Sequence, residues 1–204
     1  MKPSILTFLF GSLAAAQVMQ SRLFQLVINS RSKELDGRVF SACHVGAAIE
    51  TICVYHDDKM PFRGFRLNST QDVQNTQAPA GGVIGILTWD MNTEPPIPSS
   101  MSLSINPASN VALPLFTPGI MTAQLVGFDL DDNMIIVSFL NDTVTPSATR
   151  SGYALQNWYL CTITYSSYTY VTLAWTLGRE KPQNPTCVKI TVKRKFVQGA
   201  MEGQ

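Results

Sequence analysis

Short apolar runs recur along this chain, and residues that favour turns separate one run from the next. Phe24, Leu26 and Ile28 alternate with more polar positions, and Asp36-Gly37 precedes the next run. Alternation of this kind, with many β-branched and aromatic residues, is typical of half-buried strands. Roughly ten such strands predict an all-β fold, either an antiparallel β-sandwich or a barrel-like sandwich.

The last third of the chain shows the clearest strands. Trp158 to Tyr165 and Tyr168 to Leu177 meet at Ser166-Ser167, which predicts a hairpin. Glu94 to Pro98 carries three prolines, which lack the amide hydrogen that a sheet needs. We therefore expect this stretch to cross the surface between two sheets. The polar stretch from Asn68 to Gly82 predicts a long loop.

Four cysteines constrain the fold further. An even number of cysteines in an exported chain indicates disulfides, and four cysteines allow three pairings. We favour Cys43–Cys53 and Cys161–Cys187, because each pair is local and brackets a plausible hairpin or adjacent-strand contact. No pair has the C-x-x-C spacing of a zinc site.

Residues 1–16 have the order of a secretory signal peptide. Lys2 gives a positive start, Ile5 to Leu13 is apolar, and Ala14-Ala15-Ala16 ends the run in small residues. The apolar run is about half of the ~20 residues that span a bilayer, so we expect a cleaved leader and no membrane anchor. Residues 17–204 then form a single β-rich domain with a polar C-terminal tail, located outside the cell.

Charge excludes one class of partner. The chain has 15 Lys and Arg against 14 Asp and Glu, and removal of Lys2 balances the two. A neutral chain lacks the basic surface with which proteins bind nucleic acids or anionic membranes. We expect an extracellular glycan or protein as the partner.

Two N-x-S/T motifs predict glycosylation, at Asn68 and at Asn141. Each acceptor lies at the end of a strand-like run, where a glycan can face water. Since the chain carries a leader, we expect at least one of them to be modified.

Asp129, Asp131 and Asn133 are weak candidates for a calcium site, because closely spaced carboxylates and amides can surround this cation. The rest of a calcium loop is missing, since Met134 stands where glycine is required and Leu140 where glutamate is required. Asp and Asn also favour turns, so we expect a hairpin turn here, with no metal and no cofactor.

Catalytic signatures are weak. The two histidines are His44 and His56, and neither lies in a recognisable triad pattern. No G-x-S-x-G or H-E-x-x-H motif is present. A glycosidase needs two carboxylates, for which Glu50 and Glu94 are the pair to consider.

Aromatic residues gather in the predicted hairpin. Trp158, Leu160 and the alternating set Val171, Leu173 and Trp175 are expected in the core. Tyr168 and Tyr170 share the opposite face, where exposed tyrosines could stack on a sugar or a partner protein. They are the candidate binding face.

The chain resembles a family of small secreted fungal proteins that share a β-rich domain of unknown function. The resemblance rests on motifs spread over nearly all of residues 17–204: Leu35-Asp36-Gly37-Arg38-Val39-Phe40-Ser41-Ala42-Cys43-His44-Val45-Gly46-Ala47-Ala48, Phe65-x-Leu67-Asn68, Gly85-x-Leu87-x-Trp89, Trp158-Tyr159-Leu160-Cys161 and Asn184-Pro185-Thr186-Cys187. It implies an exported β-rich fold and supplies no catalytic residues.

These observations favour a non-enzymatic extracellular interaction protein that binds a glycan, a wall component or a host protein. A carrier of a small apolar ligand, with a pocket inside a β-barrel, is the first alternative. A glycoside hydrolase that uses a carboxylate pair is the second.

Overall fold

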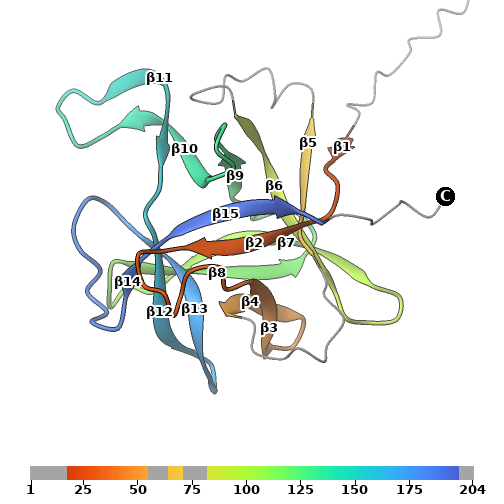
Figure 1. Cartoon of the computed structure of the whole chain (residues 1–204). Coiled ribbons are helices and arrows are strands. Elements are labelled where there is room, and N and C mark those ends of the chain that lie inside the picture. Colours follow the sequence, from red (N-terminus) through yellow and green to blue (C-terminus); the bar gives the residue numbers. More distant parts are fainter. Residues whose placement is uncertain (1–17, 55–63, 71–81, 198–204) are drawn as a thin grey trace, which may run out of the picture.

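The computed structural model describes residues 18–54, 64–70 and 82–197 (Figure 1). The predicted leader, the polar tail, His56 and most of the predicted loop from 68 to 82 lie outside the described residues. Within them the fold is all-β and antiparallel, as predicted. No helix that could cross a membrane occurs in these ranges.

Fifteen strands make up the regular structure of the described ranges. In chain order they are β1 (Val18–Gln20), β2 (Phe24–Asn29), β3 (Phe40–Gly46), β4 (Ile49–Val54), β5 (Arg66–Thr70), β6 (Val83–Met91), β7 (Ile97–Ile105), β8 (Val111–Pro118), β9 (Leu125–Phe128), β10 (Met134–Asn141), β11 (Ala148–Leu155), β12 (Trp158–Tyr165), β13 (Tyr168–Thr176), β14 (Val188–Lys189) and β15 (Thr191–Phe196).

Thirteen of these strands form one curled sheet. Its main path runs β11-β10-β9-β6-β7-β8-β4-β13-β12-β14, with β3 paired to β4, β5 paired to β6, and β1 paired to β5. Strand β13 pairs with both β4 and β8, so the sheet branches at this point.

Strands β2 and β15 come from opposite ends of the chain and form a second, two-stranded sheet. They lie side by side across the front of the large sheet in Figure 1. Three isolated bridges connect them to it: Phe24 with Phe65, Val27 with Val39, and Lys193 with Asn133. The small sheet therefore covers the concave side of the large one.

The core lies between the two sheets. Phe24, Leu26 and Ile28 of β2 are buried, while the residues between them are half-buried, which is the alternation that the sequence predicts. They pack against large side chains of the curled sheet, among which Phe40, Phe65, Phe116, Phe128 and Trp158 are fully buried. Trp158 Nε1 donates to the Met134 carbonyl at 2.8 Å, which satisfies a polar group inside the core.

One expectation about the strands was wrong. Glu94 to Pro98 does not cross between sheets, because β6 and β7 are antiparallel neighbours and these residues belong to their hairpin. Pro98 lies inside β7 opposite Asp90. Since pairing of β7 with β8 begins at Ser100, a residue without an amide hydrogen is tolerated at this end of the strand.

Both favoured disulfides are confirmed. Cys43–Cys53 links β3 to β4, with the Cα atoms 6.0 Å apart, and Cys161–Cys187 links β12 to the segment before β14, with the Cα atoms 4.1 Å apart. Thr172 of β13 is the cross-strand partner of both Cys53 and Cys161. The two disulfides therefore lie in one row on the convex face of the sheet, opposite the core.

Candidate functional site

The convex face of the β12–β13 hairpin carries a group of tyrosines. Tyr165 pairs with Tyr168 across the strands, and Ile163 pairs with Tyr170. Directly paired residues of an antiparallel ladder point to the same side of the sheet. The hairpin therefore places Tyr165, Tyr168 and Tyr170 together at its tip, on the face away from the core.

Two of these rings form a parallel pair. The Tyr168 and Tyr170 ring centroids are 6.3 Å apart, and their planes differ by 5°. The rings of His44 on β3 and Tyr168 are nearly perpendicular, with their centroids 5.2 Å apart. Tyr168 is 38% exposed. The side chains predicted as a binding face thus present aromatic surface to solvent and are held in place by a neighbour.

A half-open cavity of about 300 Å³ lies beside this group. Tyr165 belongs to its lining, which connects the cavity to Tyr168 across the hairpin. The other lining residues come from the end of β7, from the β7–β8 connection, from β8, from β12 and from the segment after β13: Ser104, Ile105, Asn106, Pro107, Ser109, Val111, Leu113, Ile163, Thr164 and Asn184.

The lining combines an apolar floor with neutral polar groups. Val111 and Leu113 are buried, and Leu113 packs in a small cluster with Val45 and Leu115 on the convex face. The polar lining consists of amides and hydroxyls, and none of the lining residues carries a charge. Such a site suits a neutral ligand that has both apolar faces and hydroxyl groups.

Two loops are tied together at the cavity wall. Asn110 N–H donates to Gln183 Oε1 at 2.9 Å, and Gln183 N–H donates to Asn110 Oδ1 at 2.9 Å. Asn110 Nδ2 also donates to the Lys181 carbonyl at 3.0 Å. This reciprocal pair joins the β7–β8 connection to the segment that supplies Asn184.

Asn184 is itself held in one orientation. Its Nδ2 donates to the Thr162 carbonyl at 3.1 Å, while its Oδ1 accepts from Thr186 Oγ1 at 2.7 Å and from Thr186 N–H at 2.9 Å. The Cys161–Cys187 disulfide anchors the same segment to β12. The wall is therefore formed before any ligand arrives.

Comparison with known proteins gives one match. Residues 21–196 match the family described as a domain of unknown function, DUF7907. The chain belongs to this family. No curated protein and no solved structure matches it.

The family match includes the tyrosines, His44, all the cavity residues and both disulfides. The predicted resemblance to a family of unknown function is thus confirmed. The family description adds no ligand or reaction.

Asp129, Asp131 and Asn133 lie in the turn between β9 and β10. Asp129 Oδ1 accepts the N–H groups of Asp131 and Asn133, at 3.0 and 2.8 Å, and Asp129 Oδ2 accepts from Asn133 Nδ2. Asp132 adopts a φ of 60° in this turn. In the ranges that the structure covers, no three His, Cys, Asp or Glu residues come together as metal ligands.

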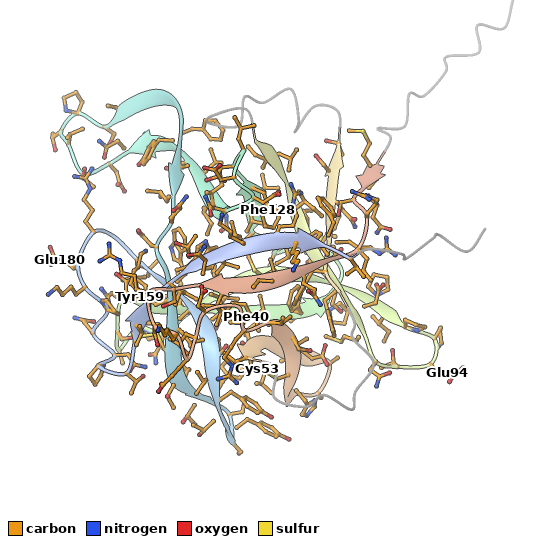
Figure 2. The ribbon with its side chains drawn as sticks, in the orientation of Figure 1. Phe40, Cys53, Glu94, Phe128, Tyr159 and Glu180 are labelled. Carbon is orange, nitrogen blue, oxygen red and sulfur yellow. A yellow bond between two sulfur atoms is a disulfide. The ribbon has the colours of Figure 1, made fainter. Side chains whose placement is uncertain are left out.

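The two carboxylates considered for catalysis lie on different parts of the fold. Glu50 is in β4, opposite His44, and Glu94 is in the connection between β6 and β7. Figure 2 shows Glu94 at the tip of that connection, away from Cys53 on β4. Neither glutamate belongs to the cavity lining.

The sequon residues differ in their surroundings. Asn68 lies in β5 and accepts a hydrogen bond from Gln20 Nε2 at 3.0 Å. Asn141 ends β10 and is only 6% exposed. Its Oδ1 accepts from Thr143 Oγ1 at 2.6 Å and from Thr143 N–H at 3.2 Å.

A cation lies farther along the same convex face. Lys189 Nζ is 4.7 Å from the centroid of the Tyr159 ring, and it donates to the Gln156 carbonyl. Partial burial lowers the pKa of the Lys189 amine, because burial disfavours the charged form. Lys189 does not line the cavity.

The alternation in the sequence predicts that Tyr168 and Tyr170 share a face, whereas no sequence pattern predicts the cavity. Asn106-Pro107 and Asn184-Pro185 have the composition of turns, and nothing in the sequence places these two turns together. Asn110 and Gln183 are 73 residues apart in the chain, so no local sequence pattern predicts their reciprocal hydrogen bonds.

Proposed function

We propose that this chain is an exported, non-enzymatic binding protein whose site takes a neutral glycan. The proposal rests on one observation: three tyrosines share a face with a cavity lined by amides, hydroxyls and apolar side chains, without a charged residue.

Sugar chemistry matches this lining. The C–H face of a pyranose packs on aromatic rings, and its hydroxyls exchange hydrogen bonds with amide and hydroxyl side chains. A charged ligand would lose its hydration in the cavity without gaining an opposite charge, which costs free energy. The lining therefore favours a neutral glycan over a charged ligand.

Export is supported by the cysteines. The cysteines described by the structure are all in disulfides, and disulfides persist in oxidising compartments such as the cell exterior. The signal-peptide pattern of residues 1–16 points the same way. A wall polymer or a glycan on a host surface would then be the accessible partner.

The other two functions have less support. A carrier of apolar ligands needs a pocket inside the sheet, yet the described core between the two sheets is filled by large side chains. A glycosidase needs two carboxylates facing one cleft, and the described cavity has no carboxylate in its lining.

A binding experiment tests the proposal. Purified protein is incubated with insoluble chitin, β-1,3-glucan, cellulose and mannan, and the bound fraction is compared with that of the double variant Tyr168→Ala/Tyr170→Ala. We expect wild type to bind at least one polymer, and the double variant to bind about tenfold more weakly, as expected when central aromatic contacts are removed.

Tyr153→Ala is the matched control, because Tyr153 lies on β11 and its hydroxyl donates to the Leu140 carbonyl. This variant should bind like wild type. Equal binding by the Tyr168→Ala/Tyr170→Ala variant, or no binding of any polymer by wild type, would overturn the proposal. Release of soluble sugar from a polymer would replace it with an enzymatic function.

A further inference from the structure

We infer that the cavity and the tyrosine pair are two subsites for one oligosaccharide: the cavity holds a single sugar unit, and Tyr168 and Tyr170 contact the units that follow. This inference rests on the proposed glycan-binding function and states which part of the site contacts which sugar unit.

The size of the cavity argues for one unit. Its volume of about 300 Å³ is at the lower end of the range in which proteins hold small molecules, ~300–1,000 Å³. A single sugar ring suits this space, and a longer stretch of chain has to continue outside it. Tyr165 provides the continuation, because it lines the cavity and is paired directly with Tyr168.

The polar groups of the wall are fixed in advance. The hydrogen bonds of Asn184 to Thr162 and Thr186 leave one hydrogen of its amide group for a ligand hydroxyl. Asn106 Oδ1 accepts the Ala108 N–H at 2.9 Å, which orients that side chain and leaves its amide group as a donor. Groups fixed in this way lose little conformational entropy when a ligand binds.

Asn110 and Gln183 are positioning residues for this subsite. Neither residue lines the cavity, and both join the two loops that do. If the reciprocal bonds are removed, the two loops can separate, and the donors of Asn106 and Asn184 no longer converge on one sugar ring. The tyrosine pair stands on the hairpin and does not depend on this connection.

The two subsites predict different effects of two double variants on a short and on a longer sugar. Wild type, Asn110→Ala/Gln183→Ala and Tyr168→Ala/Tyr170→Ala are titrated with a monosaccharide methyl glycoside and with the trisaccharide of the same sugar. The sugars used are N-acetylglucosamine, glucose in β-1,3 linkage, glucose in β-1,4 linkage, and mannose, and affinity is measured by two-dimensional NMR. Thermal unfolding of each variant is recorded in parallel.

We expect Asn110→Ala/Gln183→Ala to weaken both ligands by the same factor, about tenfold. Tyr168→Ala/Tyr170→Ala should weaken the trisaccharide and leave the monosaccharide unchanged. Because the loop variant also removes hydrogen bonds that stabilise the fold, Ile105→Trp is a second test, and we expect it to weaken both ligands. Ile105 lines the cavity and is 60% exposed, so a larger side chain there fills the cavity while the loop connection stays intact.

The outcomes separate the two proposals. If wild type binds none of the sugars, both the proposed function and the two-subsite arrangement are wrong. If wild type binds and Tyr168→Ala/Tyr170→Ala weakens it, while Ile105→Trp changes neither affinity, the two-subsite arrangement alone is wrong. Equal loss of both ligands in every variant would indicate one undivided site and would also overturn it.

Discussion

Arg194 Nη2 lies 2.6 Å from Asp132 Oδ1 and joins β15 of the small sheet to the turn between β9 and β10. The Arg194 guanidinium also lies 4.5 Å from the ring centroid of Phe128 and 4.7 Å from that of Phe196. The Arg194 N–H donates to the Asp132 carbonyl at 2.8 Å. This cluster connects the small sheet to the large one beside the core.

The two members of this ion pair should contribute unequally to stability. The Arg194 side chain is 12% exposed and that of Asp132 is 42% exposed. Arg194→Ala removes the contacts with the rings of Phe24, Phe128 and Phe196 as well as the charge, so we expect it to lower the free energy of unfolding by about 2 kcal/mol. Asp132→Asn keeps a residue that tolerates the positive φ, and the exposed pair contributes only about 1 kcal/mol.

Urea unfolding, followed by tryptophan fluorescence, measures both variants. Lys193→Ala, on the neighbouring position of β15, is the control for an altered charge on the same strand. A larger loss for Asp132→Asn than for Arg194→Ala would show that the charge pair, and not ring packing, dominates this cluster.

The two disulfides should contribute different amounts to the free energy of unfolding, measured by the same urea titration. Cys43 and Cys53 are 10 residues apart, and Cys161 and Cys187 are 26 residues apart. A longer closed loop restricts the unfolded chain more, so we expect losses of about 2.7 kcal/mol for Cys43→Ala/Cys53→Ala and about 3.5 kcal/mol for Cys161→Ala/Cys187→Ala. The opposite order of urea midpoints would contradict this account.

Glycosylation should distinguish the two sequons. The Asn141 side chain is buried and accepts two hydrogen bonds from Thr143, so a glycan there would require this turn to open. Asn68 is half-buried, and its Oδ1 accepts a hydrogen bond from the exposed Gln20 side chain. In protein secreted from eukaryotic cells we expect the glycan on Asn68 and unmodified Asn141.

Peptide mapping by mass spectrometry measures the glycan occupancy of both sites in one experiment. The N-glycans are first removed enzymatically in heavy-oxygen water, which labels each asparagine that carried one. Asn184 is the internal negative control, because Pro185 prevents its modification. A glycan found at Asn141 and not at Asn68 would reverse the prediction.

Much of the fold could be predicted because it depends on neighbours in sequence. The alternation of Phe24, Leu26 and Ile28 follows from the two-residue period of a strand, and the structure buries these three side chains. The Trp158–Tyr165 and Tyr168–Leu177 runs share a two-residue turn, which sets their register. The same period places Tyr168 and Tyr170 on one side of the hairpin, as the alternation predicts.

Other elements depend on contacts that no local pattern records. Strand β11 was not predicted, since its sequence includes Gly152 and several small polar residues. The structure gives a reason for this glycine, because a Cβ atom there would lie 2.8 Å from Phe139 Cε1 on the neighbouring strand. Whether a strand tolerates Pro98 likewise depends on its partner strands. At this position β7 pairs with β6, and its pairing with β8 begins only at Ser100.

The amino-acid sequence alone determined most of the strands, the inward-facing side chains of strands such as β2, and which cysteines are close enough to pair, since each depends on a short stretch of chain. Tertiary structure alone decided that β2 and β15, from opposite ends of the chain, cover one core, and that Asn110 meets Gln183 to form a cavity wall. The physical reason is that contacts between distant segments arise from how the sheet curls and branches as a whole, and the free energy that selects this arrangement is shared by the entire core.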